Sequence, residues 1–411
     1  MSTIHSSHFI SAAASGNDWR EAAKTILEGV TEHKPSQNGF NLGFLYISDS
    51  LSDDAQSILN LFKSVLNIEQ WVGGIGIGIC ANGQSFIDQP AISVMLGKFE
   101  DDDFKVFPPF STDSIDAQNS LKSWLENHDP MLIYVNGDPL SDQDPEQTLK
   151  TLDMTCNGFT VGGLTSSRET HSQFANDVYD DGVSGVAFDQ NIKVATTLSQ
   201  GCTRIGETHT ITRCDGHDVI ALDGEKTVEV FEDDLRQMVK SKYDLDPDAV
   251  QVDESALDNP EDVPDEFKGL MKGEVHVAFP ISEFDGNDYL VRNILGIDPD
   301  TGAMSVSQHV NKGDRLVFVH RDHKSVSSDL STKLLELRKR VQSQEGEFAP
   351  KGALYVSCVA RAFNEFQGEY ENEMALIRDI IGDVPLTGFY AGGEINKGRL
   401  YGYTGILTLF L

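Results

Sequence analysis

The feature that most constrains the fold is a pattern of strand, helix and strand that occurs three times along the chain. The predicted strands lie at residues 42–47, 71–72 and 91–96 in the first copy, at 131–135, 159–161 and 182–188 in the second, and at 353–357, 386–390 and 405–411 in the third. A recurring unit of about 60 residues implies duplicated packing, in which each helix covers a sheet that neighbouring units extend. We therefore expect an α/β fold in which repeated strand–helix–strand–strand units form two related mixed-sheet domains.

Helical spacing of apolar residues predicts the helices between these strands. A helix runs from Trp19 towards Val30, and Asp18 or Asn17 is placed to cap its first turn. The helix of the first copy opens near Ser52. Its predicted buried stripe consists of Ala55, Ile58, Leu59, Phe62 and Val65.

A different kind of sequence separates the second copy from the third, and we place a domain boundary near residue 200. The expected domains are residues 20–200 and 201–411. Residues 244–266 contain ten Asp or Glu, three Pro and no Lys or Arg. This composition is typical of a solvated insertion.

Charge and composition exclude several classes of function. The chain has 65 Asp and Glu against 32 Lys and Arg, a formal charge of −33, which disfavours nucleic acid and anionic lipid as partners. No apolar run approaches the ~20 residues of a membrane-spanning helix, so membrane insertion is not expected. The start of the chain lacks the pattern of a secretion signal, and the five cysteines form no CxxC pair. We expect a cytoplasmic protein without a metal centre.

Most catalytic signatures are absent, but paired glycines recur after the second strand of each copy. The pairs are Gly73-Gly74, Gly162-Gly163 and Gly392-Gly393. Glycine lets the backbone take positive φ or approach another group closely. One such pair indicates only a tight bend, whereas three pairs at corresponding places favour a shared cleft.

Two further clusters place a thiol near a cation at a strand end: Cys202 with Arg204, and Cys358 with Arg361. Glu394 adds a carboxylate beside the last glycine pair. A guanidinium and a carboxylate at one sheet edge can recognise the two charged groups of a zwitterion. Alternatively, Arg361 and Glu394 form an internal salt bridge. A catalytic cysteine would need a neighbouring base, and the sequence places none beside either cysteine.

These clusters are also where the chain resembles the FIST family, with both its N-terminal and C-terminal domains. The segments that carry the resemblance are residues 161–164, 199–206, 222–231, 352–361 and 385–395, the last of which includes Gly388 and Phe389. The match extends from about residue 20 to 411. The chain departs from many relatives at Val72–Gly76, where they have a Gly-Cys-Ser/Thr segment followed by an acidic residue.

The resemblance implies a sensory module that binds small molecules such as amino acids. Because the chain ends in a predicted strand, we expect the signal to pass to a separate partner such as a histidine kinase. No cofactor is predicted. Some family members resemble haem-based nitric-oxide sensors, so a haem sensor is one alternative, with no histidine assigned as ligand. An enzyme of unknown reaction that uses Cys358 or Glu394 is another.

The predicted ligand-binding residues combine the glycine pairs with the clusters at the strand ends. They are Gly73, Gly74, Gly162, Gly163, Cys202, Arg204, Cys358, Arg361, Gly388, Phe389, Gly392, Gly393 and Glu394. No residue is predicted to be catalytic or to bind a metal.

The acidic insertion gives a first testable prediction. Ten carboxylates without cations of their own cannot be buried cheaply, so residues 244–266 should contribute little to the core. Deleting the segment should leave the thermal midpoint of unfolding nearly unchanged in scanning calorimetry. A large drop would mean that the segment packs against the core.

Overall fold

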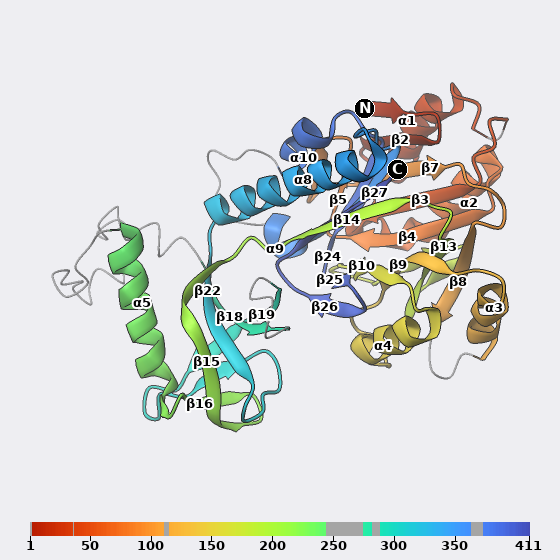
Figure 1. The fold of residues 1–411 in the computed structure, drawn as a ribbon. Coiled ribbons are helices and arrows are strands. Elements are labelled where there is room, and N and C mark those ends of the chain that lie inside the picture. Colours follow the sequence, from red (N-terminus) through yellow and green to blue (C-terminus); the bar gives the residue numbers. More distant parts are fainter. Residues whose placement is uncertain (1, 36, 111–114, 244–273, 282–287, 363–372) are drawn as a thin grey trace. The chain divides into compact units, whose positions relative to one another are not determined.

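The computed structural model describes residues 2–35, 37–110, 115–243, 274–281, 288–362 and 373–411 (Figure 1). They form two compact units, of which the first combines Met1–Gln200 with Leu330–Leu411 and the second is Gly201–Asp329. The break expected near residue 200 is a boundary between these units, but the last strands of the chain join the first 200 residues. The acidic segment 244–266 lies outside the described residues.

The first unit contains three mixed sheets, which confirms the α/β class. Sheet I has the spatial order β1 (Ser2–His5), β2 (Phe9–Ser15), β7 (Ala91–Gly97), β3 (Leu42–Ser48), β4 (Gln70–Gly76), β11 (Gln173–Ala175) and β12 (Val178–Tyr179). Sheet II has the order β26 (Arg399–Tyr401), β25 (Gly393–Asn396), β10 (Phe159–Leu164), β9 (Pro130–Gly137), β13 (Val183–Asp189) and β8 (Phe104–Phe110). Sheet III has the order β14 (Val194–Ser199), β27 (Gly405–Phe410), β23 (Gly352–Cys358), β24 (Leu386–Ala391), β5 (Gly78–Ala81) and β6 (Gln84–Ile87).

The three copies of the sequence pattern have the same strand topology. In each copy the first strand is parallel to the second and antiparallel to the last. The first strands are β3, β9 and β23, the second are β4, β10 and β24, and the last are β7, β13 and β27. Residues 42–97 and 353–411 therefore share one strand order.

The inner faces of the three sheets meet in one apolar core. Phe44 from sheet I, Leu132 from sheet II and Val356 from sheet III are all members of it. Helices cover the outer faces: α1 (Trp19–Thr31) and α2 (Ala55–Leu66) on sheet I, α3 (Ile115–Leu125) and α4 (Pro145–Cys156) on sheet II, and α8 (His323–Glu345) and α10 (Glu373–Ile381) on sheet III. Figure 1 shows α8 and α10 along one side of the first unit and α3 and α4 along another. Each copy therefore supplies one sheet of a shared core together with its outer helices.

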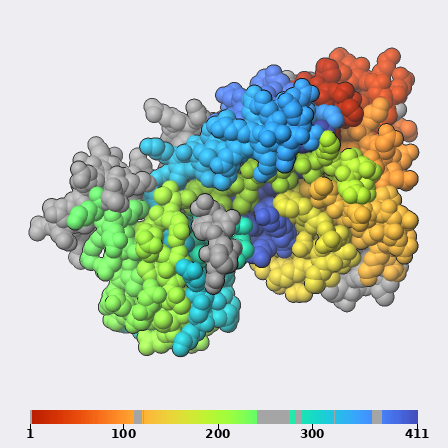
Figure 2. Space-filling view, viewed as in Figure 1, coloured from red at the N-terminus to blue at the C-terminus, as the bar shows by residue number. Residues whose placement is uncertain are grey.

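A hairpin from each copy leaves its own sheet and completes the next one. The β5–β6 hairpin of the first copy pairs with β24, the β11–β12 hairpin of the second pairs with β4, and the β25–β26 hairpin of the third pairs with β10. In the space-filling view the dark blue C-terminal hairpin lies against the yellow second copy (Figure 2). This cyclic exchange explains why the C-terminal strands belong to the first unit.

The second unit is a smaller, sheet-rich body that contains α5 (Thr227–Tyr243) and the first residues of α8. Its strands are β15 (Thr203–Asp215), β16 (Asp218–Leu222), β17 (Glu225–Lys226), β18 (Glu274–Pro280), β19 (Tyr289–Arg292), β20 (Ile294–Ile297), β21 (Met304–Val306) and β22 (Arg315–Arg321). Val277, Leu316 and Phe318 contribute to its core.

The first two glycine pairs lie inside strands rather than at corners. Gly73 in β4 and Gly162 in β10 have φ angles of 144° and 148°, and a Cβ at either would lie 1.8 Å from the carbonyl oxygen of the neighbouring parallel strand. The corresponding residue of the third copy is Gly388, where a Cβ would lie 1.7 Å from the carbonyl oxygen of Tyr355. The equivalence expected for Gly392-Gly393 is therefore wrong, because that pair lies at the junction of β24 and β25.

The close approach at Gly388 gives a steric prediction. Gly388→Ala should lower the free energy of unfolding by about 2 kcal/mol or more, because its Cβ would overlap a backbone oxygen that cannot move alone. Gly296→Ala is the matched control, since a Cβ there meets nothing within 4 Å and neither glycine has a positive φ. Calorimetry of both variants checks this. Equal midpoints for the two variants would contradict it.

Candidate functional site

The predicted site residues divide between the two units. Cys202 and Arg204 belong to the second unit, and all the others belong to the first. In the second unit the carbonyl of Cys202 accepts a hydrogen bond from the Tyr289 hydroxyl at 3.2 Å, and the exposed Arg204 guanidinium donates to Thr208.

The second glycine of each early pair faces the shared core. Gly74 and Gly163 occupy the register position that Phe389 holds in the third copy. A Cβ on Gly163 would lie 3.1 Å from the Phe389 ring, which stacks on Tyr46 with a centroid distance of 5.0 Å. The missing side chain at Gly163 thus makes room for the Phe389 ring.

Arg361 is held in an intramolecular ion pair. It lies in α9 (Val359–Ala362), directly after β23, and its side chain is 1% exposed. Its Nε donates to Glu373 at 2.8 Å, and its Nη2 donates to the same carboxylate. Its Nη1 donates to the carbonyls of Ser199 and Tyr403 at 3.4 and 3.3 Å. The salt bridge that the sequence left open is thus formed with Glu373 instead of Glu394.

Glu394 is fully buried and only half of its carboxyl group is hydrogen-bonded. Its Oε2 accepts from the backbone N–H and the hydroxyl of Thr404 at 2.9 and 2.8 Å. Its Oε1 has no hydrogen-bond partner among the described residues. Burial raises the pKa of Glu394 to about 7, although hydrogen bonds from Thr404 and Cys358 and the charge of Arg361 oppose this shift. Near neutral pH this carboxyl group can therefore either accept or donate a hydrogen bond.

The residue at the equivalent position of another copy can be compared with Glu394. Glu394 lies opposite Gly163 in the exchanged hairpin, and Gln173 lies opposite the equivalent Gly74. The Oε1 of Gln173 accepts from the backbone N–H and hydroxyl of Ser184 at 3.1 and 3.0 Å, as Glu394 Oε2 does from Thr404. The other arm of Gln173 donates to two backbone carbonyls. The neutral amide of Gln173 therefore accepts the same pair of hydrogen bonds that Glu394 accepts from Thr404. What distinguishes Glu394 from Gln173 is its unpaired second oxygen.

Further buried polar groups surround the ion pair. Ser357 donates to Glu373 at 3.0 Å, while the Tyr355 hydroxyl has no hydrogen-bond partner among the described residues. Burial raises the pKa of Tyr355 well above its usual value. We call Tyr355, Ser357, Cys358, Arg361, Glu373, Glu394 and Thr404 the polar cluster. The sequence did not single out Glu373, Tyr355, Ser357 or Thr404. Ser357 and Tyr355 lie within a segment of the family resemblance, whereas no local pattern marks Glu373.

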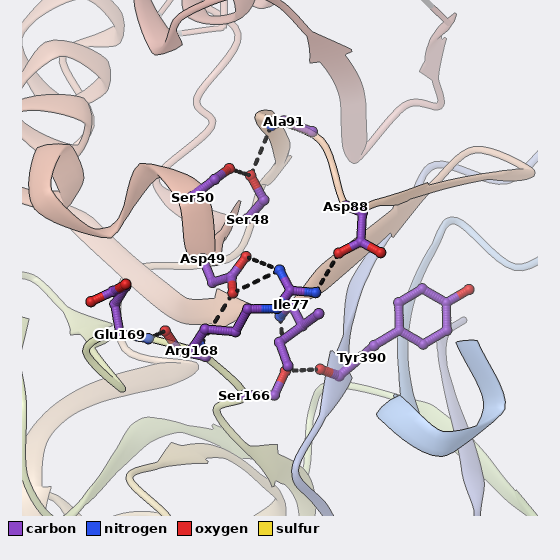
Figure 3. Close-up of polar contacts among 11 residues, drawn as sticks. Ser48, Asp49, Ser50, Ile77, Asp88, Ala91, Ser166, Arg168, Glu169 and Tyr390 are labelled. Atoms are coloured by element: carbon purple, nitrogen blue, oxygen red, sulfur yellow. Dashed lines mark hydrogen bonds and ion pairs between the residues drawn. The ribbon is translucent and has the colours of Figure 1, made fainter. Parts of the chain in front are cut away.

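A second polar group lies where strands of the three copies end (Figure 3). The Ser166 hydroxyl donates to the Tyr390 carbonyl at 2.5 Å and accepts from the Ile77 N–H at 2.9 Å, so it links all three copies. Arg168 lies 3.3 Å from the buried Asp49 and also pairs with Asp88. Because these charges are paired with one another, the group is best explained as a structural clamp.

In the second unit, His209 lies between two carboxylates. Its ring nitrogens are 2.7 Å from Asp223 and 2.9 Å from Asp234. Burial alone lowers the pKa of His209, but its hydrogen bonds to Asp234 and Asp223 outweigh that effect and raise it overall.

Among the described residues no group of three or more His, Cys, Asp or Glu is arranged to hold a metal ion. Within the described ranges of both units, no helix has the length and apolar character needed to cross a membrane.

The buried carboxyl gives a prediction with a defined sign. Glu394 retains a proton in the folded state between its ordinary pKa of 4.5 and about 7, and unfolding releases it. Stability therefore falls as pH rises through this window, by about 3 kcal/mol in total. Denaturant unfolding at pH 5 and pH 8 should show this loss in the wild type but not in Glu394→Gln. Equal losses in both proteins would mean that Glu394 titrates normally.

Comparison with known proteins places the chain in a family. The FIST N domain model matches residues 41–225, and the FIST C domain model matches residues 249–397. An uncharacterized Mycobacterium tuberculosis protein, Rv0628c, is 27% identical over 388 residues, which is 90% of this chain and 91% of that protein. An uncharacterized Mycobacterium bovis protein, Mb0898c, is 30% identical over 262 residues, or 61% of this chain and 60% of its own length. The chain therefore belongs to the FIST family and carries both of its domains, which are regarded as sensory ligand-binding domains in signalling.

Proposed function

We propose that this protein is a small-ligand sensor in which Glu394 binds a hydrogen-bond donor of the ligand, such as the ammonium group of an amino acid or its derivative. The single observation that carries the proposal is the unpaired Oε1 of a fully buried carboxyl group. Leaving such an acceptor without a partner costs about 1–3 kcal/mol, more if it is charged. A ligand ammonium would remove this cost and favour the ionised form of Glu394.

The polar cluster also supplies positive charge for the rest of such a ligand. Arg361 lowers the pKa of Glu394 through its charge, so the two side chains interact electrostatically. A ligand carboxylate would have to compete with Glu373 for the guanidinium. We therefore assign Arg361 mainly a positioning role: it holds the end of β23 and the start of α10 around the cluster. Cys358 and the Gly392-Gly393 junction complete the proposed site beside Glu394.

Calorimetric titration with an amino-acid panel tests the proposal. Glu394→Gln should weaken binding of the best ligand about 10- to 100-fold, because a charged hydrogen bond is lost. Gln173 performs the same structural task at the equivalent position, so the variant should still fold. Glu32→Gln, at an exposed carboxylate, is the matched control. The proposal fails if no member of the panel binds the wild type, or if Glu394→Gln binds as tightly as the control.

Arg361→Lys separates binding from folding in the same experiment. Lysine keeps the charge but loses the planar fork that bonds Glu373 through two nitrogens. Thermal melts of this variant should show lower stability. If its binding is unchanged while its stability falls, Arg361 is a structural residue and Glu394 alone carries recognition.

A further inference from the structure

An apolar groove runs between α1 and α2 on the outer face of the first unit. It has a volume of about 530 Å³. A second hollow of about 210 Å³ shares Thr31 and Val65 with it and extends it past the end of α1. The apolar lining of the larger hollow comes from Trp19, Leu27, Leu61 and Val65.

Val65 departs from the pattern that the sequence predicts. The helical stripe places it in the core, but the structure leaves it 49% exposed and buries Leu66 instead. Leu27 and Leu61 are only partly buried. The outer surface of α2 thus has an apolar edge with no covering element among the described residues.

The charge around this groove is opposite to that of the whole chain. Arg20, Lys24 and Lys34 line the two hollows, and Glu28 is the one carboxylate among their lining residues. The helix α2 contains no Asp or Glu, although 65 of the 411 residues are acidic. A surface of this kind attracts an acidic partner that the rest of the molecule repels.

Trp19 adds a second, independent observation. Its side chain is 8% exposed, yet its indole N–H has no hydrogen-bond partner among the described residues. The Arg20 guanidinium lies over its ring, 4.4 Å from the centroid. The Arg20 guanidinium is therefore held beside the groove, where it can pair with a carboxylate of a partner.

We propose that this groove binds an amphipathic helix of a partner protein that has an apolar stripe bordered by carboxylates. The stripe would contact Leu27, Leu61 and Val65, and the carboxylates beside it would pair with the cations that line the two hollows. The 13 residues of α1 span about 20 Å, which matches three to four turns of a docked helix. A second copy of this chain is a poorer occupant, because two molecules of charge −33 repel each other.

The inference rests on the proposed function in one respect: a sensor must pass its signal to a partner. The test uses the full chain and two synthetic 18-residue helices that share a leucine stripe at i, i+3, i+4 and i+7. One carries Glu along the stripe and the other carries Lys. Fluorescence anisotropy should show the Glu peptide binding at least about tenfold more tightly than the Lys peptide, with a preference that weakens at high salt.

Substitutions in this chain test whether the Glu peptide binds in the groove. Val65→Asp should weaken the Glu peptide at least about tenfold, whereas Met154→Asp on α4, at a 76% exposed site, should not. Lys24→Glu should weaken the Glu peptide and strengthen the Lys peptide, a reciprocal change that misfolding would not produce.

Three results would overturn the inference. They are equal binding of both peptides, unchanged binding to Val65→Asp, and a wild-type dimer in sedimentation that Val65→Asp dissociates, which would make a second copy the occupant. The ligand titration with Glu394→Gln uses different residues, so failure of one proposal is distinguishable from failure of the other.

Discussion

The first unit depends on the cyclic exchange of hairpins among its three copies. Each exchanged strand forms backbone hydrogen bonds with a sheet that another copy builds, as β25 does along Val161–Leu164. The exchange covers a sheet edge that would otherwise expose unpaired backbone groups. The first 200 residues therefore cannot complete sheet II or build the centre of sheet III without the C-terminal strands.

The same exchange builds the polar cluster. Glu394 is carried by β25 into sheet II, yet its hydrogen bonds reach Thr404, which leads into β27 of sheet III. Buried charges are costly unless they are paired and hydrogen-bonded, and the Arg361–Glu373 pair meets both conditions. Glu394 meets them only in part, because one oxygen of its carboxyl group is left unpaired. This imbalance is what separates a candidate binding group from a structural one.

The inner and outer faces of the sheets serve different tasks. Inside, glycine leaves room for a larger side chain of another copy, as Gly163 does for the Phe389 ring. Outside, the helices bury one face and expose the other to solvent or partners. On α2 that exposed face is apolar at Val65 and carries no acidic residue, in contrast to the strongly acidic chain. The proposed ligand site and the proposed docking groove thus lie on different layers of one unit.

The local elements could be predicted from the sequence: the three copies, the order of their strands along the chain, and helix α1 with Asp18 or Asn17 as its cap, of which the structure shows Asp18. Apolar periodicity and capping are local properties, so they can be recognised without the fold. Other features emerge only in the packed fold: Gly388 corresponds to Gly73, Arg361 pairs with Glu373, and Val65 is exposed. These outcomes depend on strand register, on contacts between copies and on which residues face a neighbouring element, and no short stretch of sequence encodes them.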